Sequence, residues 1–241
     1  MSDAVRAQLA PTGRLRAGIN LSNFLLVTGK TPSGDPVGVA PDMAAEIGRR
    51  LGVPVDYVTY RTPGELADAV DSGVWDIGLI GAEPQRAEKI TFTPAYVEIE
   101  STYLVPPGSA IQSLADVDLA GIRIAVTDRT AYGLWLDRNI KHATLVRTDT
   151  LDSSYDVFAA QGLEALAGLR PKLISEARKM PGSRILDGKF AAVQQAIGTA
   201  KANAAASQWL TAFVGEVTDS GFVGGLIAKH HVEGLSVARG Q

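Results

Sequence analysis

Residues 75–105 read WDIGLIGAEPQRAEKITFTPAYVEIESTYLV, which predicts a strand, a tight turn with one arginine, and a long second strand. The apolar run from Ile77 to Ile80 is typical of a strand that is buried on both faces of a sheet. Gly81 and Ala82 follow it, and such small residues let a ligand approach the backbone closely. Arg86 comes within the next turn and can bind a carboxylate through two hydrogen bonds, although an arginine after a strand is more often a solvated surface charge.

Outward from this stretch, the chain alternates predicted strands and helices in two series that are separated by Pro106-Pro107-Gly108. In the first series we expect strands at residues 14–19, 55–60 and 75–80, and helices at 41–51 and 64–70. In the second we expect strands at 122–126, 144–147, 163–167 and 184–186, and helices at 130–139, 151–160, 203–217 and 221–230. This pattern predicts mostly parallel sheets flanked by helices, with ligands at the carboxyl ends of the strands.

The composition narrows the classes of function. With 241 residues and 46% hydrophobic content, the chain can form two modest cores or one large one. A net charge of -3 gives no reason to expect nucleic acid or an anionic membrane as a partner, and the absence of cysteine excludes disulfides and thiolate metal sites. The histidines, His142, His230 and His231, lack a metal-ligand spacing, and we interpret them as surface residues. We therefore expect neither a metal nor a cofactor, and no run is apolar enough for membrane insertion.

The first residues, MSDAVRAQLAPTG, show none of the three parts of a secretory signal peptide. Two alternatives follow for the localisation. Either a signal was removed and Met1 replaced it, in which case the protein is periplasmic or extracellular, or Met1 is the natural start and the protein is cytoplasmic.

Six segments carry a family resemblance, and they follow one another along nearly the whole chain: GRLRAGINLSNF (13–24), GVAPDMAAEIGRRLGV (38–53), AVDSGVWDIGLIG (69–81), PQRAEKITFTPAY (84–96), SLADVDLAGIRIAVTDRTAY (113–132) and SGFVGGLIAKH (220–230). In this order they resemble the type II periplasmic solute-binding proteins of amino-acid ABC transporters. The resemblance implies a two-lobed α/β fold, each lobe a mostly parallel sheet flanked by helices. It implies a discontinuous lobe 1 (1–102 plus 193–241), a lobe 2 (103–192), and two crossing hinge strands near residues 98–105 and 191–198.

The resemblance also implies ligand contacts in both lobes. In lobe 1 these are Arg86 with its neighbours Gly81, Ala82 and Glu83, and a first loop with Asn20, Asn23 and Phe24. Family members usually have an aromatic side chain in that loop, and Phe24 would take this role. In lobe 2, Thr130 would contact a ligand carboxylate together with the free N–H groups of the helix that it caps. The equal alternative is an ordinary capped helix.

Two departures from the family pattern bear on the ligand. Arg129 precedes Thr130, where the family usually has glycine. In GLRPKL (168–173), Leu169 or Arg170 stands where an aspartate usually binds the ligand ammonium. An anion with two acidic groups fits these changes better than an amino acid does, with Arg86 binding one group and Arg129 or Arg170 the other. Alternatively, Arg170 simply opens a surface helix.

We therefore expect a monomeric solute-binding protein that closes by hinge motion on a small organic anion and delivers it to an ABC permease. The anion is an amino acid or, in preference, a carboxylate or dicarboxylate. The alternative is a cytoplasmic lyase or dehydratase, related in fold to cyclohexadienyl dehydratase. Glu83 would then act as general acid or base, assisted by Tyr103 or Tyr132, whereas its ordinary role would be that of an acid at a helix start.

Overall fold

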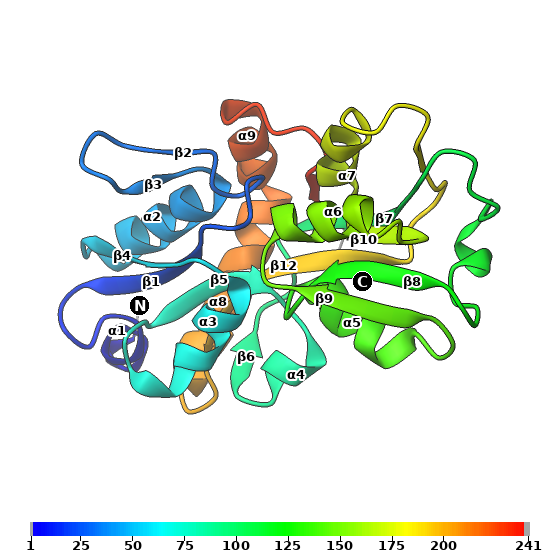
Figure 1. Ribbon diagram of the computed structural model, residues 1–241. Coiled ribbons are helices and arrows are strands. Elements are labelled where there is room, and N and C mark those ends of the chain that lie inside the picture. Colours follow the sequence, from blue (N-terminus) through cyan, green and yellow to red (C-terminus); the bar gives the residue numbers. More distant parts are fainter. Residues whose placement is uncertain (1, 239–241) are drawn as a thin grey trace. The chain divides into compact units, whose positions relative to one another are not determined.

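The computed structural model describes residues 2–238, which form two units, each with parallel and antiparallel strands and flanking helices (Figure 1). Unit 1 consists of Met1–Glu98 and Gln194–Gln241, and unit 2 consists of Ile99–Val193. The chain passes from one unit to the other within β7 (Val97–Val105) and returns within β12 (Ala191–Ala200). The predicted α/β class is confirmed. Met1, on which the two localisation alternatives depend, lies outside the described residues.

The sheet of unit 1 has the strand order β4–β1–β5–β12. β1 (Leu15–Asn20) is parallel to both β4 (Val55–Tyr60) and β5 (Ile77–Gly81), whereas β12 is antiparallel to β5. Short strands complete the unit: β6 (Ile90–Phe92) on β12, β13 (Ser236–Val237) on β7, and the hairpin of β2 (Gly29–Lys30) with β3 (Pro36–Val37). Parallel pairing brings the carboxyl ends of β1, β4 and β5 to the same edge.

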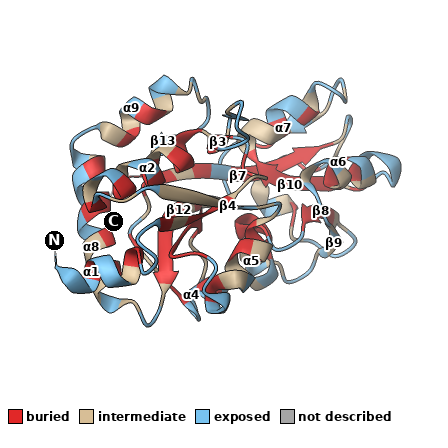
Figure 2. Ribbon diagram, turned by 90° about the vertical axis from the view of Figure 1, so that its left-hand side faces the viewer, coloured by how far each residue is buried: buried red, intermediate tan, exposed pale blue. Residues whose placement is uncertain are grey.

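The helices of unit 1 follow the apolar periodicity of the sequence. They are α1 (Asp3–Leu9), α2 (Val39–Leu51), α3 (Pro63–Asp68) with a 3-10 turn (Ala69–Ser72), α4 (Pro84–Ala87), α8 (Ala204–Asp219) and α9 (Phe222–Lys229). α2 buries Met43, Ile47 and Leu51, and it ends at Gly52 in a left-handed conformation, as predicted. α1 was not predicted, because only Val5 and Leu9 are buried in it. Figure 2 shows much of the strands coloured as buried, whereas the helices carry both buried and exposed residues.

Unit 2 has the strand order β7–β10–β8–β9. β8 (Arg123–Thr127) is parallel to β9 (Thr144–Thr148) and β10 (Ala165–Leu169), β7 is antiparallel to β10, and β11 (Arg184–Ile185) pairs with β7. The helices are α5 (Ala131–Asn139), α6 (Leu151–Ala160), α7 (Arg170–Ala177) and a 3-10 turn (Leu114–Asp116). β10 begins later than predicted, because Leu163 N still donates to Phe158 O of α6 at 3.0 Å.

One histidine contradicts the sequence interpretation. His142 and His231 are exposed, but the side chain of His230 is only 7% exposed. Its Nε2 lies 2.8 Å from Asp42 Oδ2 of α2, and Lys229 Nζ lies 2.7 Å from the same oxygen. His230 was wrongly interpreted as a surface residue, because its partner is far away in the sequence.

Neither a membrane-spanning helix nor a metal-binding cluster is found within residues 2–238. No helix there has the length and apolar character needed to cross a membrane. The same residues contain no group of three or more histidine and acidic side chains arranged to hold a metal ion.

Gly38 fixes the loop that follows β1, residues 21–28, which we call the β1 loop. Gly38 has a φ of 149°, and a Cβ there would lie 2.2 Å from Leu26 O. We expect Gly38→Ala to lower the free energy of unfolding by about 3 kcal/mol, because strain and a backbone clash add. Gly34→Ala is the control: its φ is 94° but no atom lies within 4 Å, so it should cost about 1 kcal/mol. Equal losses in urea denaturation would contradict the clash.

Candidate functional site

The β1 loop is held by two asparagine side chains. Asn20 Oδ1 accepts hydrogen bonds from Ser22 N at 3.1 Å and from Ser22 Oγ at 2.8 Å. Asn23 is buried, and its Oδ1 accepts from Leu25 N at 3.3 Å. Such bonds from a side-chain oxygen to the backbone two residues on are typical of turns. Both carbonyls are therefore used to shape the loop, and the Phe24 ring that follows Asn23 is 37% exposed.

The turn after β5 carries the predicted arginine. Arg86 is only 6% exposed, and its Nη1 donates to Gly81 O, at the end of β5, over 2.7 Å. Ala82 N donates to Gln194 O, and Glu83 stands at the N-cap of α4 and is partly buried. The alternative of a solvated surface charge is thus wrong for Arg86. The structure instead places a buried guanidinium at the edge of the unit 1 sheet where β1 ends and the β1 loop begins.

Thr130 caps α5, as predicted. It is buried, its Oγ1 accepts from Gly133 N at 3.1 Å, and the same hydroxyl donates to Thr127 O at 2.8 Å. Arg129, just before it, is exposed and has a φ of 54°. A left-handed residue favours glycine, which is the residue that the resembling family usually has there. This chain therefore has a charged residue in a conformation that is sterically unfavourable for it.

Arg170 opens α7 directly after β10. Its Nε donates to Glu100 Oε2 at 2.9 Å, and its Nη2 donates to Gly188 O. Lys189 Nζ lies 3.5 Å from the other oxygen of Glu100. Leu169, the last residue of β10, is buried. The family resemblance implies an acidic residue at this position. The structure has the apolar side chain of Leu169 there, followed by Arg170, which is paired with the carboxylate of Glu100.

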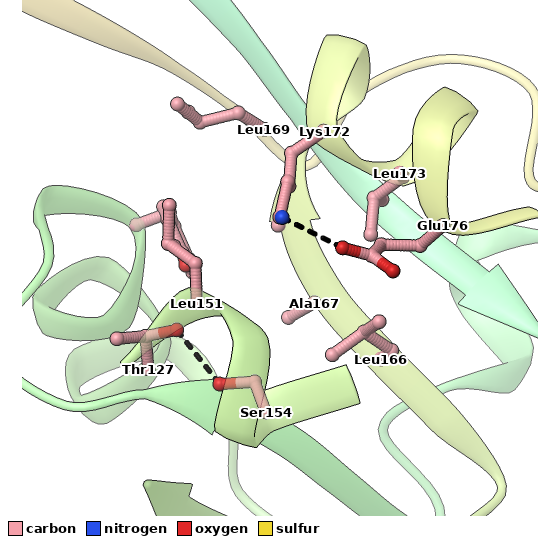
Figure 3. A pocket seen from close by; sticks show the side chains of 11 residues that line it. Thr127, Leu151, Ser154, Leu166, Ala167, Leu169, Lys172, Leu173 and Glu176 are labelled. Atoms are coloured by element: carbon pink, nitrogen blue, oxygen red, sulfur yellow. Dashed lines mark hydrogen bonds and ion pairs between the residues drawn. The ribbon is translucent and has the colours of Figure 1, made fainter. Parts of the chain in front are cut away.

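A small recess lined by both apolar and polar side chains lies at the carboxyl ends of β8 and β10, and the sequence did not reveal it (Figure 3). Its volume is about 10 Å³, close to the smallest that holds one water. Its lining is Thr127, Tyr132, Leu151, Ser154, Leu166, Ala167, Gly168, Leu169, Lys172, Leu173 and Glu176. Ser154 Oγ lies 2.7 Å from Thr127 Oγ1 and 2.5 Å from Thr148 Oγ1. Lys172 and Glu176 have the spacing of an exposed helix pair, which is why neither residue was singled out.

Two tyrosines that were considered for proton transfer are buried. Burial raises the pKa of Tyr103 and, despite opposing effects that include hydrogen bonds with Thr127 and Thr130, that of Tyr132. The Tyr103 ring packs on Phe190, with 4.6 Å between centroids. A phenol whose pKa lies above its usual range is a weak acid near neutral pH, so neither residue is well suited to acid catalysis.

Comparison with known proteins gives a family and a fold. Residues 19–233 match the family model of the bacterial extracellular solute-binding proteins, family 3. No curated protein matches the sequence. Similar solved structures include an amino acid ABC transporter substrate-binding protein from Streptococcus pneumoniae bound to L-arginine, with a TM-score of 0.74 and 19% identity over 98% of this chain and 100% of that one.

Two further structures have the same fold. A binding component of an ABC transporter from Wolinella succinogenes, complexed with lysine, has a TM-score of 0.76 and 18% identity over 92% of this chain and 97% of that one. An ancestral amino acid-binding protein, a precursor of cyclohexadienyl dehydratase, has a TM-score of 0.73 and 20% identity over 95% of this chain and 99% of that one. At such identities the likeness shows the fold alone.

Strain at Arg129 can be separated from its charge. We expect Arg129→Gly to raise the free energy of unfolding by about 1 kcal/mol, because glycine adopts a φ of 54° without steric cost. Arg129→Ala removes the same charge and keeps the strain, so it should not stabilise the protein. Equal midpoints for the two variants in urea denaturation would show that the left-handed conformation carries no cost.

Proposed function

The chain belongs to family 3 of the bacterial extracellular solute-binding proteins, and on this premise we propose that it binds a carboxylate or dicarboxylate anion for an ABC transporter. The observation that carries the proposal is the burial of the Arg86 guanidinium at the carboxyl end of β5. Ligands of open α/β sheets bind at this end of the strands. A carboxylate offers two acceptors in the geometry that a guanidinium matches, and its charge is opposite to that of Arg86.

The neighbouring loop supports a polar ligand with an apolar part. β1 and β5 are adjacent and parallel, so the β1 loop begins at the same edge of the sheet as the turn that carries Arg86. Asn20 and Asn23 would contribute NH2 donors, and Phe24 would pack on the carbon skeleton. In unit 2 we propose that Thr130 and the first N–H groups of α5 contact an anionic group, as a helix N-terminus favours negative charge.

The end of β10 argues against a free α-ammonium on the ligand. An ammonium beside Leu169 would lose its bound water, and the apolar Leu169 side chain offers it no hydrogen-bond acceptor. The guanidinium of Arg170, the next residue, carries a charge of the same sign as the ammonium. Similar structures were solved with L-arginine and with lysine, so these amino acids are the proper competitors in any binding test. Delivery to a permease, hinge closure and a monomeric state stay predictions.

Arg86→Ala tests the proposal. We expect it to weaken binding of the carboxylate ligand by about 2–5 kcal/mol, the range for removal of one partner of a buried charge pair. The ligand is found by proton NMR line broadening in a pool of amino acids, dicarboxylates, keto acids and hydroxy acids, and its dissociation constant is then measured by calorimetry. Lys89→Ala is the control, because Lys89 follows α4 but is exposed and pairs with Asp71. An unchanged dissociation constant in Arg86→Ala would remove Arg86 from the site.

The same NMR samples separate a binding protein from a lyase. A binding protein leaves the spectrum of its ligand unchanged over a day apart from broadening. New product resonances that disappear in Glu83→Gln would instead establish catalysis with Glu83 as the acid or base.

The missing acidic residue can be restored. We expect Leu169→Asp to improve the affinity for amino acids by about tenfold or more, because a charged hydrogen bond to the ammonium contributes about 1.5–3 kcal/mol. Leu169→Asn has the same size without the charge and should give little gain. If both variants bind amino acids as the parent does, position 169 does not face the ligand.

A further inference from the structure

Gln195 carries a buried amide beside the end of β5. It lies in β12 opposite Gly81, the last residue of β5, and both residues belong to unit 1 (Figure 1). Gln195 is only 5% exposed, and within residues 2–238 its side-chain amide has no hydrogen-bond partner. Both amide atoms nevertheless keep some accessible surface, since neither is among the fully enclosed side-chain atoms that lack a partner.

Two other glutamines in unit 1 show how such an amide is ordinarily used. Gln8 Oε1 accepts from Ala206 N at 2.8 Å, and Gln194 Nε2 donates to Glu98 Oε2 at 3.1 Å. Both are more exposed than Gln195 and have less need of a partner. Burial of an amide without a partner costs free energy, because water is removed from it and no hydrogen bond replaces that water. The chain itself thus leaves the hydrogen-bonding capacity of Gln195 unused.

The pairing of β5 with β12 places this amide at the end of β5. Ala82 N donates to Gln194 O at 2.8 Å. This bond makes Gly81 and Gln195 an opposed pair without hydrogen bonds between them. In such a pair the two Cα atoms are about 4.5 Å apart, and the side chains lie on the same face of the sheet. Gly81 has no side chain, so the residue opposite Gln195 does not cover its amide.

The same pairing leaves the carbonyl of Gly81 to Arg86. Because Gly81 O does not accept from Gln195 N, it can accept from Arg86 Nη1, and it does so at 2.7 Å. Arg86 therefore contacts the carbonyl of the same residue whose Cα lies opposite Gln195. Both side chains are buried at the carboxyl end of β5, where open α/β sheets bind ligands. A ligand whose carboxylate is bound by Arg86 would have its adjoining atoms close to Gln195.

We propose that Gln195 is a specificity-determining residue of the Arg86 site and that its amide binds a hydroxyl group next to the ligand carboxylate. An amide offers a donor and an acceptor, and a hydroxyl can use both. A keto oxygen would use only the NH2 group, and a methylene group would use neither. This inference rests on the proposed function for Arg86, and it selects hydroxy acids among the carboxylates.

The test compares lactate, pyruvate and propionate, which have the same carboxylate and differ only at the second carbon. Their dissociation constants are measured by calorimetry on the full chain. We expect the parent protein to bind lactate about fivefold or more tightly than propionate, with pyruvate between them. Gln195→Leu should reduce the lactate preference below about twofold and change propionate binding by less than about twofold. Gln194→Leu is the matched control and should keep the preference, because the amide of Gln194 already has Glu98 as its partner.

Urea denaturation without added acid gives a second readout. Because the Gln195 amide has no partner in the chain, Gln195→Leu should leave the denaturation midpoint unchanged or raise it. Gln8→Leu should lower the midpoint, because it removes the bond to Ala206 N. A midpoint that falls as far in Gln195→Leu as in Gln8→Leu would show that water already satisfies the amide, and it would overturn the inference.

The binding results separate this inference from the proposed function. Equal affinities of the parent protein for lactate and propionate, no binding of lactate at millimolar concentration, or a lactate preference that persists in Gln195→Leu would overturn the role of Gln195. If Arg86→Ala loses all three acids while Gln195→Leu keeps the preference, only this inference fails and the carboxylate function stands. If Arg86→Ala binds all three acids as the parent does while Gln195→Leu loses the preference, the hydroxyl contact stands and the proposed carboxylate anchor fails.

Discussion

Parallel strand pairing is the constraint on which the rest of this structure depends. β1 is paired in parallel with β4 and β5, and β8 with β9 and β10, so within each unit the carboxyl ends of three strands lie at one edge. The chain must leave this edge through loops whose polar groups need partners. Asn20 and Asn23 satisfy backbone N–H groups of the β1 loop, and Arg86 donates to the last carbonyl of β5. The groups that could recognise a ligand are therefore also the groups that finish the strands.

In unit 2 the same requirement produces a connected set of hydroxyls. Ser154 joins the ends of β8 and β9 by contacting Thr127 and Thr148, and Thr127 O in turn accepts from the cap of α5. Gly133 allows this close approach, because a Cβ there would lie 2.9 Å from both Thr127 O and Thr130 Oγ1. A hydroxyl in such a set can reverse its donor and acceptor roles. The hydroxyls at this edge are thus fixed by mutual hydrogen bonds whose donor and acceptor roles can change.

The partner of each cation decides what that cation is able to do. Arg170 meets a carboxylate and a carbonyl from two other segments, so its charge is already used. Lys172 contacts the buried carboxylate of Glu176, which also contacts Lys179. It contacts the exposed carboxylate of Asp152 as well. Arg86 is buried at a strand end. Three cations that look alike in the sequence therefore differ in how readily an anion can reach them and in what it must displace.

The sequence alone determined the α/β class, most of the strands and helices, the stop of α2 at Gly52 and the cap of α5 at Thr130. These features depend on apolar periodicity and on capping chemistry, which are properties of residues close together in the chain. It also identified Arg86 after β5, but not whether that arginine is buried. Only the tertiary structure decided this burial, the contact of His230 with Asp42 across 188 residues, and the pairing of Arg170 with Glu100 across 70. It also decided the place of Lys172 beside the recess. The physical reason is that the sequence gives the charge of each side chain. The counter-charge of that side chain and its exposure to water depend on segments that only folding brings together.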